Sequence, residues 1–557
     1  MRWSRREVLS LILGAPLATR LLACDRPSQR ETPREIEGRL LGQDHRAGHR
    51  LRSSPPGDDI FARAPVQTTE VVIVGGGPAG LAAAYQLRRN GQRGMRLLEL
   101  EAELGGTSRD HRGPSEALAN TRAPHAFPWG AHYITQPLDH NRPLQSLLSD
   151  MGVLESDGRA VREQYLVRDP KERLFYRGFF YEGLYPAIGA TQEDRRQWQR
   201  FGAKMQALAR MRDGQGRPAF AIPMRYGSDD PTITELDRIS AATWLTKHGF
   251  TSERLRFCVD YACRDDYGLT LHDTSAWAMV LYYAARIDPA TGRGTQVITW
   301  PQGNGALVAF LRTSLAADQV RSHSLVVDVV PKPEGTGVSV HAIDTRSGKP
   351  MRVDARCAIV ATPAFVTQRI VRPIRERTAG DADRGRQVDY GAWMVANLHL
   401  SERPQERGFE QAWDTVLHDS PSLGYVNATH QRGRSFGPTV WTYYLPMTDR
   451  DARAGRRRLF EPDYSHFRDA ILLDLRRAHR DLPQKLARLD VFRWGHGMIQ
   501  PRVGTVWSPT RRTTSQPLGP IHFAHTDLSG LALFEEAFEH GVRAANEVTA
   551  VLRGSNG

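Results

Sequence analysis

The sequence feature that most constrains this chain is the run Glu70–Gly80, Glu-Val-Val-Ile-Val-Gly-Gly-Gly-Pro-Ala-Gly. Its first half is apolar and β-branched, which predicts a buried parallel strand over residues 71–74. The second half has the spacing GxGxxG, and residues 81–89 have helical composition. A strand, a glycine-rich turn and a helix in this order predict a binding site for the pyrophosphate of a dinucleotide.

Each glycine of the motif has a separate physical task. Gly75 permits the tight turn, Gly77 lets the backbone approach a pyrophosphate, and Gly80 lets the helix pack closely on the strand. The helix N-terminus adds free N–H groups and the positive end of its dipole. Because a lone GxGxxG is weak evidence, the residues that follow decide what it means.

A second predicted strand, residues 96–100, ends in acidic residues. Glu99 lies about 20 residues beyond the glycine turn, where a carboxylate can accept ribose hydroxyls, and Glu101 is the competing candidate. Gly105 and Gly106 follow a few residues later. A glycine pair after the acidic residue resembles FAD enzymes of the glutathione-reductase superfamily more than simple NAD dehydrogenases.

The C-terminal end of the chain carries a second pattern of this kind. Residues 520–527, Pro-Ile-His-Phe-Ala-His-Thr-Asp, precede a small-residue turn and a predicted helix over 533–552. This order resembles the C-terminal signature of flavin amine oxidases and phytoene-desaturase-like enzymes. The resemblance implies that Asp527 accepts a ribityl or sugar hydroxyl of FAD. His525 stands where the usual pattern has glycine.

The resemblance to the superfamily of flavin amine oxidases, protoporphyrinogen oxidases and phytoene desaturases spans residues 70–548. It implies an α/β fold, in which a Rossmann-like FAD-binding domain of the glutathione-reductase superfamily carries an inserted α+β substrate domain. The expected FAD-binding segments are 68–135, 296–385 and 491–557. The expected substrate-domain segments are 136–295 and 386–490. The resemblance also implies noncovalent FAD, with Val326 as the candidate for a backbone contact to adenine.

The middle of the chain offers candidates for substrate chemistry. Gly130-Ala131-His132 resembles the loop near the flavin ring in these enzymes, and the alternative is an ordinary turn. His132 is the candidate catalytic residue, because imidazole titrates near physiological pH. Asp265 and Asp266 form a carboxylate pair that receives a cationic amine, caps a helix N-terminus or forms a salt bridge to Arg264. Trp277, Tyr282 and Tyr283 line a pocket or belong to the core. Residues 494–502 are expected to form a loop.

The resemblance implies removal of a hydride from a small-molecule C–H bond to flavin N5, with oxygen or another molecule as electron acceptor. Amine oxidases of this family typically place a lysine near N5, but none of the six lysines lies in a matching motif. An amine and an apolar, isoprenoid-like compound therefore both stay open as substrates. The alternative is a flavoprotein that relays electrons to a protein partner or binds FAD structurally.

The N-terminal segment, residues 1–24, resembles an export signal. Ser4-Arg5-Arg6-Glu7-Val8-Leu9 resembles a twin-arginine motif, an apolar stretch follows, and Leu21-Leu22-Ala23-Cys24 resembles a lipobox. This predicts lipidation at Cys24 and a lipid-anchored protein at the periplasmic face of the inner membrane. A plain cleaved signal and an uncleaved anchor are the alternatives. Residues 25–67 are charged and poor in apolar residues, which predicts a flexible tether.

Charge and cysteine usage exclude some functions. The net charge of +13 comes from scattered basic residues, and no nucleic-acid module is visible. This charge indicates a solvated basic surface or attraction to an anionic membrane. The four cysteines lack the spacing of zinc ligands, so no metal site is predicted.

Overall fold

The computed structural model describes residues 36–53, 56–111, 126–378, 388–509, 511 and 514–554. The predicted signal, with Cys24, lies outside the described residues. All that follows concerns the unit that begins at Glu37. Among the described helices, none has both the length and the apolar character needed to cross a membrane.

A seven-stranded sheet forms around the first motif. Its strand order is β10-β3-β2-β13-β12-β11, and β19 pairs with β13. These strands are β2 (Val66–Val74), β3 (Met95–Leu98), β10 (Val320–Arg321), β11 (Ser324–Pro331), β12 (Val338–Asp344), β13 (Pro350–Val360) and β19 (Ile521–Phe523). The pairs of β2 with β3 and β13, and of β13 with β19, are parallel. The two sequence motifs therefore end at the same edge of one sheet.

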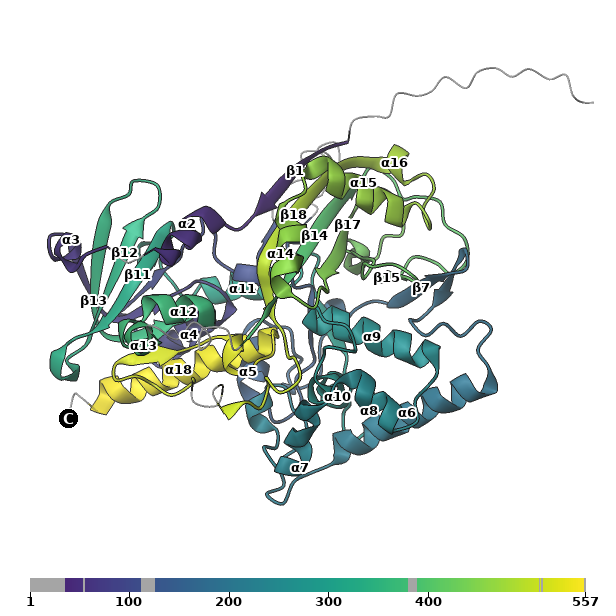
Figure 1. Ribbon diagram of the computed structural model, residues 1–557, viewed down its shortest axis with the longest axis horizontal. Coiled ribbons are helices and arrows are strands. Elements are labelled where there is room, and N and C mark those ends of the chain that lie inside the picture. Colours follow the sequence, from purple (N-terminus) through teal and green to yellow (C-terminus); the bar gives the residue numbers. More distant parts are fainter. Residues whose placement is uncertain are drawn as a thin grey trace, which may run out of the picture. The chain divides into compact units, whose positions relative to one another are not determined.

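Two helices from opposite ends of the chain pack together against this sheet. They are α4 (Pro78–Arg89) and α18 (Phe534–Gly554), drawn near each other in Figure 1. A Cβ at Gly541 of α18 would lie 2.3 Å from the carbonyl oxygen of Ala79. Close helix packing at this glycine brings the N-terminal and C-terminal motifs to one place.

An eight-stranded sheet forms a second layer, with the order β1-β18-β14-β17-β16-β15-β7-β8. Its strands are β1 (Glu37–Gly42), β7 (Glu172–Tyr176), β8 (Phe179–Glu182), β14 (Tyr390–Leu400), β15 (Asp414–Leu417), β16 (Tyr425–Asn427), β17 (Thr439–Met447) and β18 (Leu486–Ile499). The short helices α14 (Ala452–Phe460) and α15 (Tyr464–Leu475) contact it.

A helical group fills the lower right of Figure 1. It contains α6 (Gln192–Arg210), α8 (Ala241–Lys247), α9 (Glu253–Tyr267) and α10 (Ala276–Ala284), packed around Trp277 and Tyr267. The two-stranded ladder of β6 (Tyr133–Thr135) and β9 (Val297–Thr299) stands where the chain enters and leaves this region. The predicted α/β class is confirmed.

The prediction of a flexible tether over 25–67 is wrong for its described C-terminal part. We call residues 37–62, described except for 54 and 55, the N-terminal strap. It contains β1, α2 (His45–His49), the 3₁₀ turn η1 (Arg50–Arg52) and α3 (Asp58–Ala62). β1 runs parallel to β18, and the Arg39 N–H donates to Asp490 Oδ1 over 3.0 Å, a sequence separation of 451 residues. Local composition does not reveal a partner so distant.

The predicted loop at 494–502 is also wrong in its first half. Residues 494–499 continue β18, which pairs with both β14 and β1. A Cβ at Gly495 would lie 2.7 Å from the Phe460 ring, and one at Gly497 would lie 3.1 Å from the Trp393 ring. These glycines admit neighbouring aromatic rings to the strand and do not mark a turn.

Candidate active site

A single cavity of about 2210 Å³ is lined by residues of both sheets and of the N-terminal strap. Pockets for a small ligand usually measure about 300–1,000 Å³, so this one has room for a dinucleotide and a substrate together. Its lining includes the glycine turn after β2, Glu99, Val326, His132 and Asp527. The structure thus brings most of the predicted site residues to one cavity.

The glycine turn has the geometry that phosphate binding needs. Gly75 has a φ of +102°, which side chains rarely allow, and a Cβ at Gly80 would lie 1.9 Å from the Gly75 carbonyl oxygen. A Cβ at Gly77 would meet no atom within 4 Å, so open space lies in front of this backbone. The second glycine pair docks on the first, because the Gly105 N–H donates to the Gly76 carbonyl over 2.8 Å. Gly106 follows and also lines the cavity.

The two candidate carboxylates after β3 have different partners. Glu99 accepts the N–H groups of Gly76 at 2.6 Å and Glu101 at 2.8 Å, and it is thereby held beside the glycine turn. Burial raises the pKa of the Glu99 carboxyl, which these N–H groups partly offset. Glu101 instead accepts the Asp44 N–H at 2.9 Å and lies 3.7 Å from Arg109. We keep Glu99 as the candidate for ribose.

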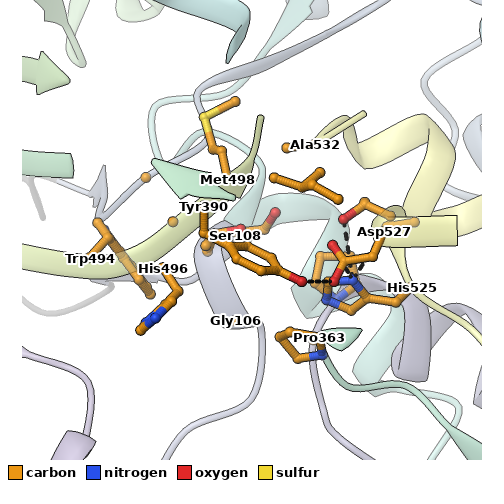
Figure 2. Close-up of a pocket in the computed structure, with 18 of the residues that line it drawn as sticks. Gly106, Ser108, Pro363, Tyr390, Trp494, His496, Met498, His525, Asp527 and Ala532 are labelled. Carbon is orange, nitrogen blue, oxygen red and sulfur yellow. Dashed lines mark hydrogen bonds and ion pairs between the residues drawn. The ribbon is translucent and has the colours of Figure 1, made fainter. Parts of the chain in front are cut away.

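Asp527 follows β19 and lies beside the turn after β13, near Pro363 (Figure 2). Its Oδ2 accepts the Ala364 N–H at 2.7 Å and the Tyr390 hydroxyl, while Oδ1 lies 3.0 Å from His525 Nδ1. Burial alone would raise its pKa, but His525 and these donors hold the pKa below the ordinary value. Oδ1 is buried and accepts no hydrogen bond from the described residues. A hydroxyl of the cofactor can supply that missing donor.

Val326 lies in β11 and lines the cavity, paired with Ala342 just before a register shift in the ladder. Its contact to adenine remains a prediction. The open space at Gly77, the unused oxygen of Asp527 and the size of the cavity together fit FAD.

His132 is buried and its Nδ1 lies 2.9 Å from the Tyr444 hydroxyl. That hydroxyl donates to the Gly130 carbonyl at 2.7 Å, so His132 donates from Nδ1 and keeps a lone pair on Nε2. Burial lowers the pKa of His132 to about 3. The imidazole is therefore neutral near pH 7, and it can accept a hydrogen bond but holds a proton poorly.

Carboxylates gather on the wall of the cavity that β7, β15 and α9 form. Asp414 of β15 lies opposite Glu172 of β7 in the parallel register, and Asp265 of α9 faces the same space. Burial, followed by repulsion from Asp266, raises the pKa of Asp265 to about 7. Burial, followed by repulsion from Glu172 and Asp265, raises the pKa of Asp414.

The predicted salt bridge between the Asp265–Asp266 pair and Arg264 is wrong. Arg264 lies 3.1 Å from Asp260, four residues earlier on the same helix. Asp266 pairs with Arg286 at 2.6 Å. Among the described residues, Asp265 has one weak polar contact, 3.5 Å from the Tyr133 hydroxyl. The alternative in which the pair receives a cation therefore stays open for Asp265.

Aromatic side chains complete this end of the cavity. Tyr133, Trp413, Tyr261, Tyr282, Tyr444 and Trp393 line it. Of the three aromatic residues singled out in the sequence, Tyr282 lines the cavity, whereas Trp277 and Tyr283 belong to or pack on the helical core. Among the described residues that line the cavity, none is a lysine.

Sequence reasoning missed several lining residues. Four of them lie on strands of the eight-stranded sheet: Asp414, Glu172, Tyr444 and Tyr390. Others belong to the N-terminal strap, which was predicted to be a flexible tether. No local spacing connects these positions, because strand pairing over long separations assembles them.

A strand–glycine turn–helix with Glu99 beside its turn, the buried Asp527 in the same lining and a cavity of this size define a flavoprotein site for FAD. The chain matches the model of the family described as flavin containing amine oxidoreductase over residues 78–549 and belongs to that family.

Three relatives illustrate the likeness. A putative flavin-containing monoamine oxidase of Mycobacterium tuberculosis, AofH, is 25% identical over 521 residues, which cover 88% of this chain and 98% of that protein. Wild-type putrescine oxidase bound to putrescine is 19% identical with a TM-score of 0.64, covering 87% of this chain and 100% of the other. Cyclohexylamine oxidase from Brevibacterium oxydans is 14% identical with a TM-score of 0.62, covering 87% and 99%. The chain is an FAD-dependent oxidoreductase with the fold predicted above.

Proposed function

We propose that this protein binds a small amine in its ammonium form and, once the nitrogen has lost a proton to solvent, removes a hydride from the neighbouring carbon, so that the nitrogen lone pair forms the C=N bond of an iminium product. The observation that carries this proposal is the pair of under-partnered carboxylates Asp265 and Asp414, with the exposed Glu172 beside them, on the aromatic wall of the FAD cavity. A buried carboxylate without a partner is costly, and a substrate ammonium group offsets that cost. The putrescine bound by the structurally similar oxidase is a diamine, which agrees with this charge complementarity.

Each group in the cavity has a physical role in this proposal. When bound, FAD supplies the hydride acceptor, its N5 atom. Asp265 and Asp414 attract the ammonium group, and the faces of Trp413 and Tyr261 stabilise it by cation–π contact. His132 Nε2 accepts a hydrogen bond and orients the reacting end. The enclosing aromatic side chains exclude water and strengthen these interactions.

Anaerobic reduction of the bound flavin tests the substrate class. We expect polyamines or primary amines to bleach the flavin absorbance rapidly, and a polyprenoid compound of similar length to leave it unchanged. Bleaching by the polyprenoid alone would reject the amine and favour the apolar alternative. Reduction only by a partner protein would favour electron relay. Peroxide formed on admitting air would identify oxygen as the acceptor.

We also propose that the protein is exported by the twin-arginine route and anchored through Cys24 at the periplasmic face of the inner membrane. The support is the order of Arg5-Arg6, the apolar stretch and the lipobox-like residues before Cys24. Mass spectrometry of the mature N-terminus tests this proposal. A diacylglyceryl cysteine at position 24 is expected. Cleavage without lipid would support the plain signal, and an intact Met1 in the cytoplasm would reject export.

A further inference from the structure

The N-terminal strap is fixed at both ends, and its middle forms part of the cavity wall. At one end, β1 pairs with β18. At the other, the Phe61 ring stacks on His341 with centroids 4.5 Å apart, and Arg372 lies 2.5 Å from Asp58. Between these anchors, α2 and η1 line the cavity that also contains the glycine turn. The strap therefore crosses the cofactor cavity as a bridge between the two sheets.

The cations that line the cavity divide into two groups. Arg286 pairs with Asp266, and Arg375 with Asp328. The others are Arg50 and Arg52 of the strap, Arg369 of α12 (Ala364–Ile370), and Arg453 and Arg456 of α14. Within the described part of the chain, no carboxylate lies in ion-pair contact with any of these five.

The unpaired arginines and their histidine neighbours approach one another. Arg52 Nη2 lies 2.9 Å from His49 Nε2, and Arg369 donates to the Leu51 carbonyl at 3.2 Å. Burial lowers the pKa of Arg456, Arg453 and Arg52 lower it further, and Asp389 and Asp451 partly offset this lowering. Positive groups that repel one another across a cavity form a site for an anion.

The glycine turn offers N–H groups and a helix dipole to a diphosphate but no full positive charge. Its neighbours in the lining are uncharged or acidic, from Gly75 to Ala79, Leu98 to Glu101, and Gly106 to Ser108. Arg109, which directly follows Ser108, faces Glu101 and the rings of Phe492 and Trp494. Positive side chains elsewhere in the lining would therefore add a charge interaction that the glycine turn itself does not supply.

We propose that Arg50 and Arg52 of the N-terminal strap, with Arg453 and Arg456 of α14, bind the diphosphate of FAD, so that the strap retains the cofactor. This inference rests on FAD binding and is independent of the substrate.

Titration of FAD into the apoprotein, followed by flavin fluorescence, tests whether the positive charge of these arginines contributes to FAD binding. We expect the double variant Arg50→Gln/Arg52→Gln to raise the Kd of FAD about tenfold or more, since a hydrogen bond to a charged group contributes roughly 1.5–3 kcal/mol. Added salt should weaken binding to the wild type more than to the variant, because it screens the arginines. Arg46→Gln is the matched control, since Arg46 lies on the same strap, is exposed and does not line the cavity.

A second variant tests retention by the strap. A Cβ at Gly38 would lie 1.7 Å from the Leu489 carbonyl oxygen, so Gly38→Val should detach β1 from β18. We expect faster release of FAD and new proteolytic cleavage within residues 37–62. Unchanged FAD affinity in the arginine variant, or an equal salt dependence in the two proteins, would overturn the diphosphate site. Unchanged FAD release after cleavage of the strap would overturn retention.

Discussion

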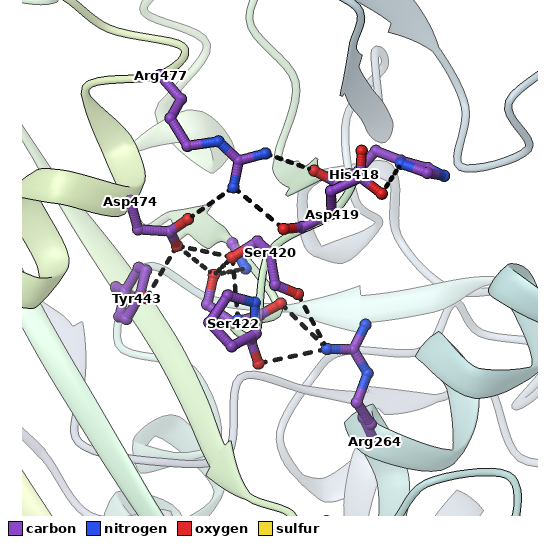
Figure 3. Close-up of polar contacts among 10 residues, drawn as sticks. Arg264, His418, Asp419, Ser420, Ser422, Tyr443, Asp474 and Arg477 are labelled. Atoms are coloured by element: carbon purple, nitrogen blue, oxygen red, sulfur yellow. Dashed lines mark hydrogen bonds and ion pairs between the residues drawn. The ribbon is translucent and has the colours of Figure 1, made fainter.

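Two groups of buried carboxylates in this molecule have opposite surroundings. Asp474 of α15 accepts the hydroxyls of Ser420 at 2.7 Å, Ser422 at 2.8 Å and Tyr443 at 3.0 Å (Figure 3). Asp265 and Asp414 in the cavity each face one tyrosine hydroxyl, at 3.5 and 3.1 Å. Asp474 and Asp414 are buried and Asp265 is half-buried, but of these three only Asp474 has donors to both of its oxygens among the described residues.

This difference in hydrogen bonding indicates a structural role for Asp474 and a binding role for the cavity carboxylates. The donors around Asp474 hold the loop 418–424 against α15, and Arg477 closes the group by reaching Asp474 and the loop carbonyls. The cavity carboxylates have raised pKa values because burial and mutual repulsion disfavour their charge. Carboxylates with pKa values shifted in this way are candidates for ligand binding.

The largest expected effect is on stability at the fully partnered site. Asp474→Ala leaves three buried hydroxyls without their acceptor, and we expect it to cost about 3–5 kcal/mol of unfolding free energy. Denaturant unfolding measures this loss. Asp469→Ala, an exposed position on the same helix, is the control and should change little. A loss below about 1 kcal/mol would contradict the structural role.

The next effect is on catalysis at the cavity. Asp265→Asn should lower kcat/KM for a cationic amine about 100-fold, near 2.7 kcal/mol, because it removes a desolvated charge opposite the ammonium. Its unfolding free energy should not fall. Steady-state kinetics and denaturation of the same preparation check both halves. An Asp265→Asn protein that is less stable but has an unchanged kcat/KM would show that Asp265 has a structural role like that of Asp474.

The pH dependence should follow Asp265 as well. Its pKa is raised to about 7 in the fold, so the carboxyl is protonated below that pH and cannot attract a cation. We expect kcat/KM to rise about tenfold between pH 6 and 8, and this limb should vanish in Asp265→Asn. The Asp265 carboxyl has a higher pKa in the folded chain than in the unfolded chain, so folding takes up a proton. The contribution of Asp265 to the free energy of unfolding therefore falls as the pH rises towards 7. The variant should therefore gain stability relative to the wild type at pH 8.

The smallest effects come from single hydroxyls. Ser422→Ala should cost about 1 kcal/mol of stability and leave kinetics unchanged, whereas Tyr261→Phe should raise KM a few-fold. Parallel thermal unfolding and kinetics on both variants make the comparison. If both substitutions changed stability and KM equally, the Asp474 group and the cavity carboxylates would not have different roles.

Much of the nucleotide site could be predicted from sequence because its signals are local. The turn at Gly75 and Gly80 depends on backbone geometry within a few residues, and Asp527 lies a few residues before α18. Glu99 sits one residue after β3, where it accepts the Gly76 N–H. The substrate end could not be predicted this way. Asp414, Glu172 and Asp265 lie on three elements that only strand pairing and helix packing bring together.

The sequence by itself determined the class of cofactor, because phosphate binding needs glycines and a helix start at fixed spacing. Tertiary structure alone decided that Trp494 to Met498 extend a strand, that residues after Glu37 cross the cavity, and that Asp265 lacks the salt bridge its neighbour has. The physical reason is the range of the interactions. A turn is specified by its own residues, whereas the charge of a cavity is the sum of side chains that meet only after folding.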